Sequence, residues 1–109
     1  MIHYVKIEDV LGKKEKKVGY TLLNEESGCV NGCTCGVSLY RAKEYGKISS
    51  HDDQEGFLIL EGRGTAYIDG EELEIEAGMC FMIPAHTEHA VKVAQDCDMC
   101  KIFWFHAAI

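Results

Sequence analysis

Short apolar stretches alternate with polar turns along most of the chain, and no segment shows a long run of helical periodicity. The stretches have the length of β-strands and glycines fall between them, which is typical of an all-β domain. Strands are expected at 18–23, 36–42, 56–60, 65–68, 71–76, 80–83, 90–93 and 99–105. This series of short strands with regular turns indicates an all-β sandwich or closed barrel.

Asp69-Gly70 provides the clearest turn, between the strands expected at 65–68 and 71–76. A two-residue β-hairpin loop of this kind needs positive φ at both positions, which Asp-Gly tolerates. After the turn, apolar residues alternate with glutamates, so one face of the strand is expected to be buried and the other hydrated. The last strand, 99–105, is mostly apolar, which predicts cover on both of its faces.

Length and charge narrow the classes of function. A chain of 109 residues fits one domain. Its formal net charge of -7, with 18 acidic against 11 basic residues, argues against nucleic acid as a partner. The lysines Lys13, Lys14, Lys16 and Lys17 are interpreted as solvated surface. No apolar run is long enough for a membrane span or a signal peptide, so we expect a cytoplasmic protein with no membrane partner.

Three side chains form the main candidate site. His51 and Glu55 are four residues apart, so on an extended segment they share a face. His89 follows a proline turn, at the head of a strand. Two imidazoles and one carboxylate suit one divalent ion, such as Fe(II), Mn(II), Ni(II), Cu(II) or Zn(II), and leave coordination positions open. The adjacent Asp52 and Asp53 are interpreted as solvated loop residues.

The first part of this set resembles a motif of the cupin family. That motif runs His-x-His, three or four residues, Glu, six residues and Gly. Glu55 and Gly62 match its end, and His51 stands at its second histidine. The first histidine is replaced by Ser49, whose hydroxyl is a poor ligand for these ions. Gly46 also lies closer to the motif than the family pattern places its glycine.

A second cupin motif runs Gly, five residues, Pro-x-Gly, two residues and His. Gly78, Pro84 and His89 match it at the right spacing, and His86 stands in place of the second glycine. Either His86 or a water molecule could fill the coordination position that the first motif lacks. Because His86 is three residues from His89 on a turn, the two side chains are expected to face different directions.

The resemblance implies a cupin double-stranded β-helix, which is a jelly-roll barrel, in residues 36–109. Residues 1–35 would form an N-terminal strand and loop extension packed on the barrel, within one structural domain. The family's ligand roles fall on His51, Glu55 and His89, which would bind one divalent transition metal. A homodimer is also expected, with a small-molecule ligand or substrate in the barrel mouth.

Specificity in such a barrel depends on the side chains that line its pocket. The expected pocket-lining residues are Tyr40, Phe57, Ile59, Tyr67, Phe81 and Trp104. His106, two residues beyond Trp104, is interpreted as the end of a strand and not as part of the pocket.

The cysteines offer a rival site. A structural zinc site could draw on Cys29, Cys33, Cys35, Cys97 and Cys100. A cupin-like jelly roll places Cys35 and Cys100 at opposite ends of one sheet, so a shared site is not expected. Cys80 and Cys100 are interpreted as buried, unreactive thiols.

Two hypotheses about function remain open, because the fold alone does not choose between them. The first is a metal-dependent enzyme, dioxygenase-like or isomerase-like, acting on a small organic molecule. Glu55 would serve as its base if it does not bind the metal. The second is a non-catalytic module that binds a sugar or an organic acid. The incomplete first motif and the absence of another obvious acid-base pair support this alternative.

Overall fold

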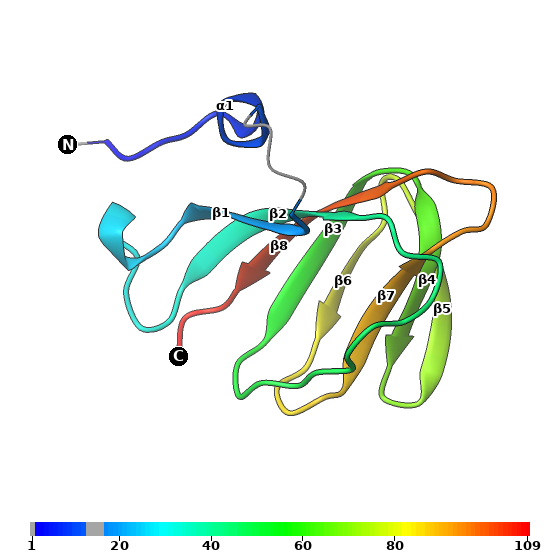
Figure 1. The fold of residues 1–109 in the computed structure, drawn as a ribbon. Helices are drawn as coiled ribbons and strands as arrows, with labels where there is room; N and C mark the ends of the chain where they lie inside the picture. Colours follow the sequence, from blue (N-terminus) through cyan, green and yellow to red (C-terminus); the bar gives the residue numbers. More distant parts are fainter. Residues whose placement is uncertain (1, 13–16) are drawn as a thin grey trace.

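The computed structural model describes residues 2–12 and 17–109 (Figure 1). Its strands are β1 (Gly19–Leu23), β2 (Thr34–Tyr40), β3 (Glu55–Glu61), β4 (Arg63–Ile68), β5 (Glu71–Glu76), β6 (Cys80–Ile83), β7 (His89–Val93) and β8 (Cys100–His106). Each corresponds to a predicted strand, and the ends differ by no more than two residues. The apolar pattern does not predict the helix α1 (Ile7–Leu11) or the 3-10 turn η1 (Glu25–Ser27), because both are too short to show a helical period.

The strands form two antiparallel sheets. The five-stranded sheet has the order β1-β2-β8-β3-β6, and the three-stranded sheet has the order β5-β4-β7. Strands that are distant in the chain therefore lie side by side, as β8 does between β2 and β3. This arrangement confirms the predicted all-β jelly roll.

Aliphatic side chains from both sheets fill the space between them. Ile59, Ile83 and Ile102 come from the five-stranded sheet, and Ala66 and Val93 come from the three-stranded sheet. All five are almost fully buried. Burial of each large aliphatic side chain contributes about 1.5–3 kcal/mol, so this core holds the two sheets together.

The hairpin at Asp69-Gly70 has the predicted geometry. Its φ angles are 50° and 84°, and β4 and β5 pair on either side of it. In β5, Ile75 is buried and the glutamates are exposed, as the alternation predicts. Leu73 remains 38% exposed, because β5 is an edge strand and the core does not extend to that position.

The prediction for the last strand holds for one face only. In β8, Cys100 and Ile102 face the core and are fully buried, whereas Lys101, Phe103 and Phe105 are only partly buried. These three side chains lie on the outer face of the five-stranded sheet. The apolar sequence of β8 therefore predicted more burial of the outer face than the structure has.

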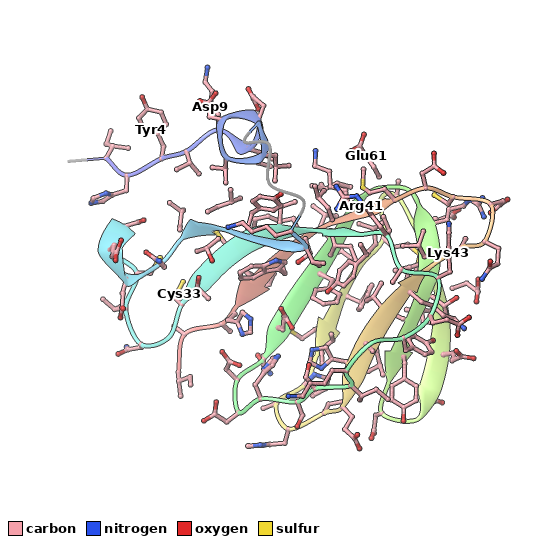
Figure 2. The ribbon with its side chains drawn as sticks, in the orientation of Figure 1. Tyr4, Asp9, Cys33, Arg41, Lys43 and Glu61 are labelled. Carbon is pink, nitrogen blue, oxygen red and sulfur yellow. The ribbon has the colours of Figure 1, made fainter. Side chains whose placement is uncertain are left out.

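The cysteines do not form a shared site. All six are free thiols, and no group of described residues that could hold a metal ion contains one of them. Cys33 lies near the start of β2, and Lys43, whose ammonium donates to the Cys97 carbonyl, lies at the other end of the molecule (Figure 2). Cys100 is buried as predicted. The same prediction for Cys80 is wrong, since it lies exposed on the edge strand β6.

The N-terminal segment packs against the barrel. It contributes β1 to the edge of the five-stranded sheet, and α1 lies outside this sheet next to β1 (Figure 1). Lys17 is exposed, whereas Lys13, Lys14 and Lys16 lie outside the described residues. No helix in the described part of the chain has the length and apolar character needed to cross a membrane.

Candidate metal centre

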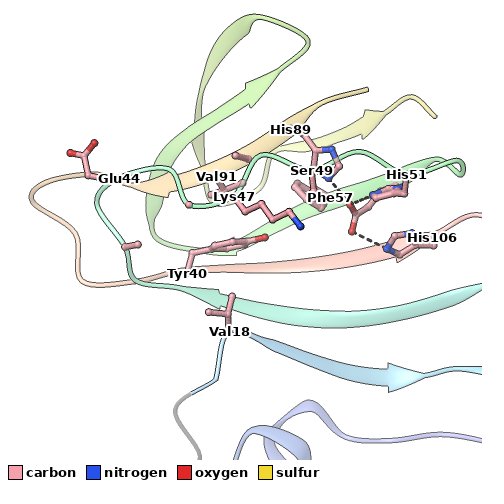
Figure 3. A pocket seen from close by; sticks show the side chains of 14 residues that line it. Val18, Tyr40, Glu44, Lys47, Ser49, His51, Phe57, His89, Val91 and His106 are labelled. Carbon is pink, nitrogen blue, oxygen red and sulfur yellow. Dashed lines mark hydrogen bonds and ion pairs between the residues drawn. The ribbon is translucent and has the colours of Figure 1, made fainter. Parts of the chain in front are cut away.

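Four side chains from three separate parts of the chain meet in one pocket (Figure 3). Glu55 is the first residue of β3, and His106, the last residue of β8, is its direct partner in the sheet. His51 lies in the loop that enters β3. His89 is the first residue of β7, so it reaches the site from the three-stranded sheet. The site therefore joins the two sheets.

The Glu55 carboxylate is the centre of this cluster. Its Oε1 atom lies 3.2 Å from Nε2 of His51 and 3.2 Å from Nε2 of His89. Its Oε2 atom lies 3.2 Å from Nε2 of His106. Glu55 and His89 are each only 8% exposed. Three imidazoles thus direct the same ring nitrogen at one buried carboxylate.

The other ring nitrogen of each imidazole, Nδ1, lies within hydrogen-bond distance of an oxygen atom outside the Glu55 carboxylate. Nδ1 of His51 lies 2.7 Å from one Asp53 oxygen, and Nδ1 of His106 lies 2.9 Å from the other. Nδ1 of His89 lies 2.9 Å from the Thr87 carbonyl oxygen. A carbonyl or an ionised carboxylate only accepts hydrogen bonds, so each Nδ1 carries a proton and donates it. In the neutral imidazoles, Nε2 is then an unprotonated lone pair.

This arrangement requires positive charge at its centre. A neutral imidazole would direct an Nε2 lone pair at a carboxylate oxygen, and two acceptors at that distance repel each other. Protons on the imidazoles or a cation between the groups would remove the repulsion. A divalent cation balances Glu55 and Asp53, since +2 and two charges of −1 sum to zero. Outer carboxylates that orient ligating imidazoles are a common feature of metal sites. The residues present therefore fit a divalent ion.

The ionisation of the cluster follows from these contacts. Burial disfavours the charge on Glu55, but hydrogen bonds and charge from His89, His106 and His51 outweigh burial and lower its pKa. The hydrogen bond to Glu55 raises the pKa of His89, against the effect of burial. Asp53 has a lowered pKa because its two imidazole partners outweigh its desolvation. Both carboxylates are thus ionised at neutral pH.

Two groups of side chains satisfy the distances needed to share an ion. They are His51, Glu55 and His89, and separately His51, Asp53 and His106. The first group is the set that the sequence singles out, and the structure brings it together. Because it contains the buried Glu55 and His89 and opens onto the pocket, it is the better candidate.

The two substitute ligands considered from the sequence lie outside the cluster. Ser49 lines the pocket, but it is exposed and is tied to His89 by two backbone hydrogen bonds. His86 is also exposed, and its backbone amide donates to the His51 carbonyl at 2.7 Å. Its φ is 63°, so it keeps the left-handed backbone of the glycine that it replaces. His86 thus links the two loops that carry the candidate ligands.

His106 is the site residue that the motifs miss. Its Nε2 atom lies 3.2 Å from the Glu55 oxygen that the other two imidazoles leave free, although its position at the end of a strand suggests no role. The useful signal is the alternation along β8, which places His106 on the same face as the buried Ile102. Asp53, interpreted as a solvated loop residue, instead binds both His51 and His106.

The pocket above the cluster has a volume of about 460 Å³. Tyr40 and Phe57 line it, as expected. The other four expected residues lie elsewhere. Ile59 is part of the core, Phe81 and Trp104 pack against the core, and Tyr67 makes an edge contact with the ring of Tyr45. The residues that line the pocket are Val18, Tyr40, Ala42, Glu44, Gly46, Lys47, Ser49, His51, Glu55, Phe57, His89, Ala90, Val91 and His106.

Comparison with known proteins identifies the family. The family profile described as the cupin domain matches residues 37–106, which is more than half of the chain. The chain belongs to the cupin family. Within this cupin, the matched segment begins in β2, ends at His106 and contains the whole candidate metal centre. No curated protein matches the chain.

Several solved structures have folds similar to this cupin over most of its length. A cupin protein from Bacteroides fragilis is 22% identical, with a TM-score of 0.70, and the match covers 99% of this chain and 87% of that chain. A predicted oxalate decarboxylase from Thermotoga maritima is 16% identical, with a TM-score of 0.72 and coverages of 84% and 79%. Hydroxypropylphosphonic acid epoxidase from S. wedmorenis is 15% identical, with a TM-score of 0.71 and coverages of 82% and 50%. At these identities the likeness shows the fold.

Proposed function

We propose that this cupin is a divalent-metal-dependent enzyme that acts on a small organic molecule through an oxygenase-like reaction. The observation that carries the proposal is the convergence of three Nε2 atoms on the Glu55 carboxylate at the floor of a pocket. A metal site that opens into a pocket of this size leaves room for a substrate beside the ion.

His51, Glu55, His89 and His106 would hold the ion, and His106 would replace the histidine that the first motif lacks. Once bound, a divalent ion supplies Lewis-acid polarisation of substrate oxygens or activation of dioxygen. Asp53 and Thr87 keep the imidazoles oriented with Nε2 toward the site. Phe57 and Val91 contribute apolar walls to the pocket.

The contacts of Glu55 favour a role as ligand over a role as base. Both of its oxygens are engaged by imidazoles, and its lowered pKa makes it a weak proton acceptor. Among the similar structures, an epoxidase and a predicted oxalate decarboxylase are enzymes, which supports catalysis on this fold.

The same contacts also favour a second candidate function. Because Glu55 is fully engaged, the pocket floor offers no free carboxylate base, as expected of a module that binds a small ligand without turnover. Such a module would bind the ligand through the same metal centre and pocket. The two functions differ only in whether the bound compound is converted.

One experiment tests both functions. The purified protein is analysed for metal, loaded separately with Fe(II), Mn(II), Ni(II), Cu(II) and Zn(II), and assayed for oxygen uptake with diketones, thiols and flavonols. We expect one ion per chain and uptake with one compound class. Glu55→Gln should abolish both, and Glu61→Gln, at the exposed far end of β3 and outside the pocket, should change neither. A protein that takes up no metal would refute the proposal. A thermal shift with a compound that is not consumed would favour the binding module.

A further inference from the structure

The loop between β2 and β3 brings a lysine into the pocket. Lys47 lies in this loop, is exposed, and lines the same pocket as the metal centre. Figure 3 shows its side chain extending inward, with the ammonium directed toward the Tyr40 hydroxyl and the histidine cluster. The Glu44 carboxylate, from the same loop, turns away from the pocket in this view. The inward charge on this loop is therefore positive.

Lys47 differs from Lys43, Lys92 and Lys101 in having no partner among the residues that the structure describes. Lys92 and Lys101 pair with glutamates, and Lys43 donates to backbone carbonyls. No ion pair or side-chain hydrogen bond involves Lys47 within residues 2–12 and 17–109. The carboxylate in this pocket, Glu55, is engaged by three imidazoles, so the Lys47 ammonium is left suited to bind a further anion.

Tyr40 provides a second donor beside this ammonium. Tyr40 lines the pocket beside Lys47, and its phenol is partly buried. A phenol carries one O–H, which can donate a hydrogen bond to an anion in the pocket. Burial raises the pKa of Tyr40 and the charge of Glu55 adds to this, so the phenol stays protonated at neutral pH.

We propose that Lys47 and Tyr40 form an anion subsite that receives the carboxylate of a small organic acid. The remainder of the acid would lie against the apolar walls formed by Val18, Phe57 and Val91, with its other end toward the metal centre. One ammonium and one hydroxyl match a single negative charge better than a phosphate dianion, which calls for more cations. The inference specifies the substrate class of the proposed function and rests on it only for the metal-facing end.

The test compares benzoate with benzamide, which have nearly the same shape but differ in charge. Each is titrated into the metal-free and the Zn(II)-loaded protein, and binding is followed by amide chemical shifts. We expect benzoate to bind at least about tenfold more tightly than benzamide in both forms, since a charge-assisted contact is lost with the amide. Amide shifts should centre on pocket residues such as Ala90 and Val91.

Variants assign the effect to the subsite. Lys47→Met should weaken benzoate binding about tenfold or more and leave benzamide binding unchanged, and Tyr40→Phe should have a smaller effect in the same direction. Lys101→Met serves as the matched control, because Lys101 lies outside the pocket and pairs with Glu61, and it should bind both compounds as the wild type does. Equal binding of the two compounds, or full benzoate affinity in Lys47→Met, would overturn the proposal. Metal uptake is measured in parallel, so failure of the metal site and failure of the anion subsite are separate outcomes.

Discussion

At the scale of single residues, the candidate site depends on which nitrogen each imidazole presents. Motif spacing predicts His51, Glu55 and His89, because the residues of one strand and one turn are fixed relative to each other. It does not predict His106, since a lone histidine after an apolar run changes faces with a shift of one residue. The role of Asp53 is also hidden, because one of its two partners, His106, lies far along the chain at the end of β8.

Substitutions of His106 and Ser49 compare two residues: His106 contacts Glu55, and Ser49 only occupies the position of a motif ligand. His106→Ala should weaken metal binding by more than the roughly 10- to 100-fold typical of outer-shell losses, because it removes a nitrogen from the site. Ser49→Ala should leave metal affinity unchanged, since Ser49 meets His89 through the backbone. Competition with a fluorescent zinc chelator measures both. A loss in Ser49→Ala, or none in His106→Ala, would contradict the assignment.

Asp53 is expected to act through the imidazoles that it binds. Asp53→Asn should lower metal affinity by about 10- to 100-fold. The amide can donate to Nδ1, so the proton of His51 and His106 would no longer be fixed on that nitrogen. Asp52→Asn, at an exposed neighbour, is the control. Ring nitrogen shifts in the metal-free protein provide a second readout. Wild-type tautomers and affinity in Asp53→Asn would show that the carboxylate has no positioning role.

The pH dependence of the metal-free protein follows from Glu55 and His89. Glu55 has a pKa lowered from 4.5, so its stabilisation is present above pH 4.5 and is lost as pH falls through the lowered value. His89 has a pKa raised from 6.5, so its stabilisation is present below pH 6.5 and is lost as pH rises through the raised value. The pair should stabilise the metal-free protein most between these limits.

Urea midpoints of the metal-free protein across this range measure the effect. His89→Gln should flatten the alkaline decline. Metal affinity should change in the opposite direction and increase with pH, because binding must displace the proton on His89. Stability that keeps increasing above pH 6.5 in the metal-free wild type would contradict the proposed ionisation.

At the scale of elements, strands were predictable because alternation and turn residues are local signals. The positions of β1 to β8 follow from them, whereas α1 does not, since five residues cannot show a helical period. The register between paired strands was harder to predict from the sequence. Which β8 residue faces Glu55 depends on packing between strands that are far apart in the chain, and this pairing decides the ligand set.

Gly64 tests the packing of β4 against β7. A Cβ at this position would overlap the backbone carbonyl of Lys92, which cannot move without breaking the pairing of the two strands. Gly64→Ala should therefore destabilise the fold by about 1–3 kcal/mol. Gly46→Ala, where a Cβ meets nothing within 4 Å, should change stability by less than about 0.5 kcal/mol. Chemical denaturation compares them, and equal stability would refute the close approach.

At the scale of the whole molecule, the candidate metal centre joins the two sheets. Glu55 and His106 belong to the five-stranded sheet, and His89 belongs to the three-stranded sheet. A bound ion would add a link between sheets that the aliphatic core already holds together. The homodimer expected from the cupin resemblance stays a prediction, and light scattering on the eluted protein measures it.

Anomalous diffraction from crystals of the protein loaded with Co(II) locates the ion directly. We expect one strong peak per chain, at bonding distance from Glu55 and from Nε2 of His51, His89 and His106, on the side that opens into the pocket. A map with no peak there, or with cobalt bound only to the thiols of Cys29 and Cys33, would contradict the metal centre on which the proposed function depends.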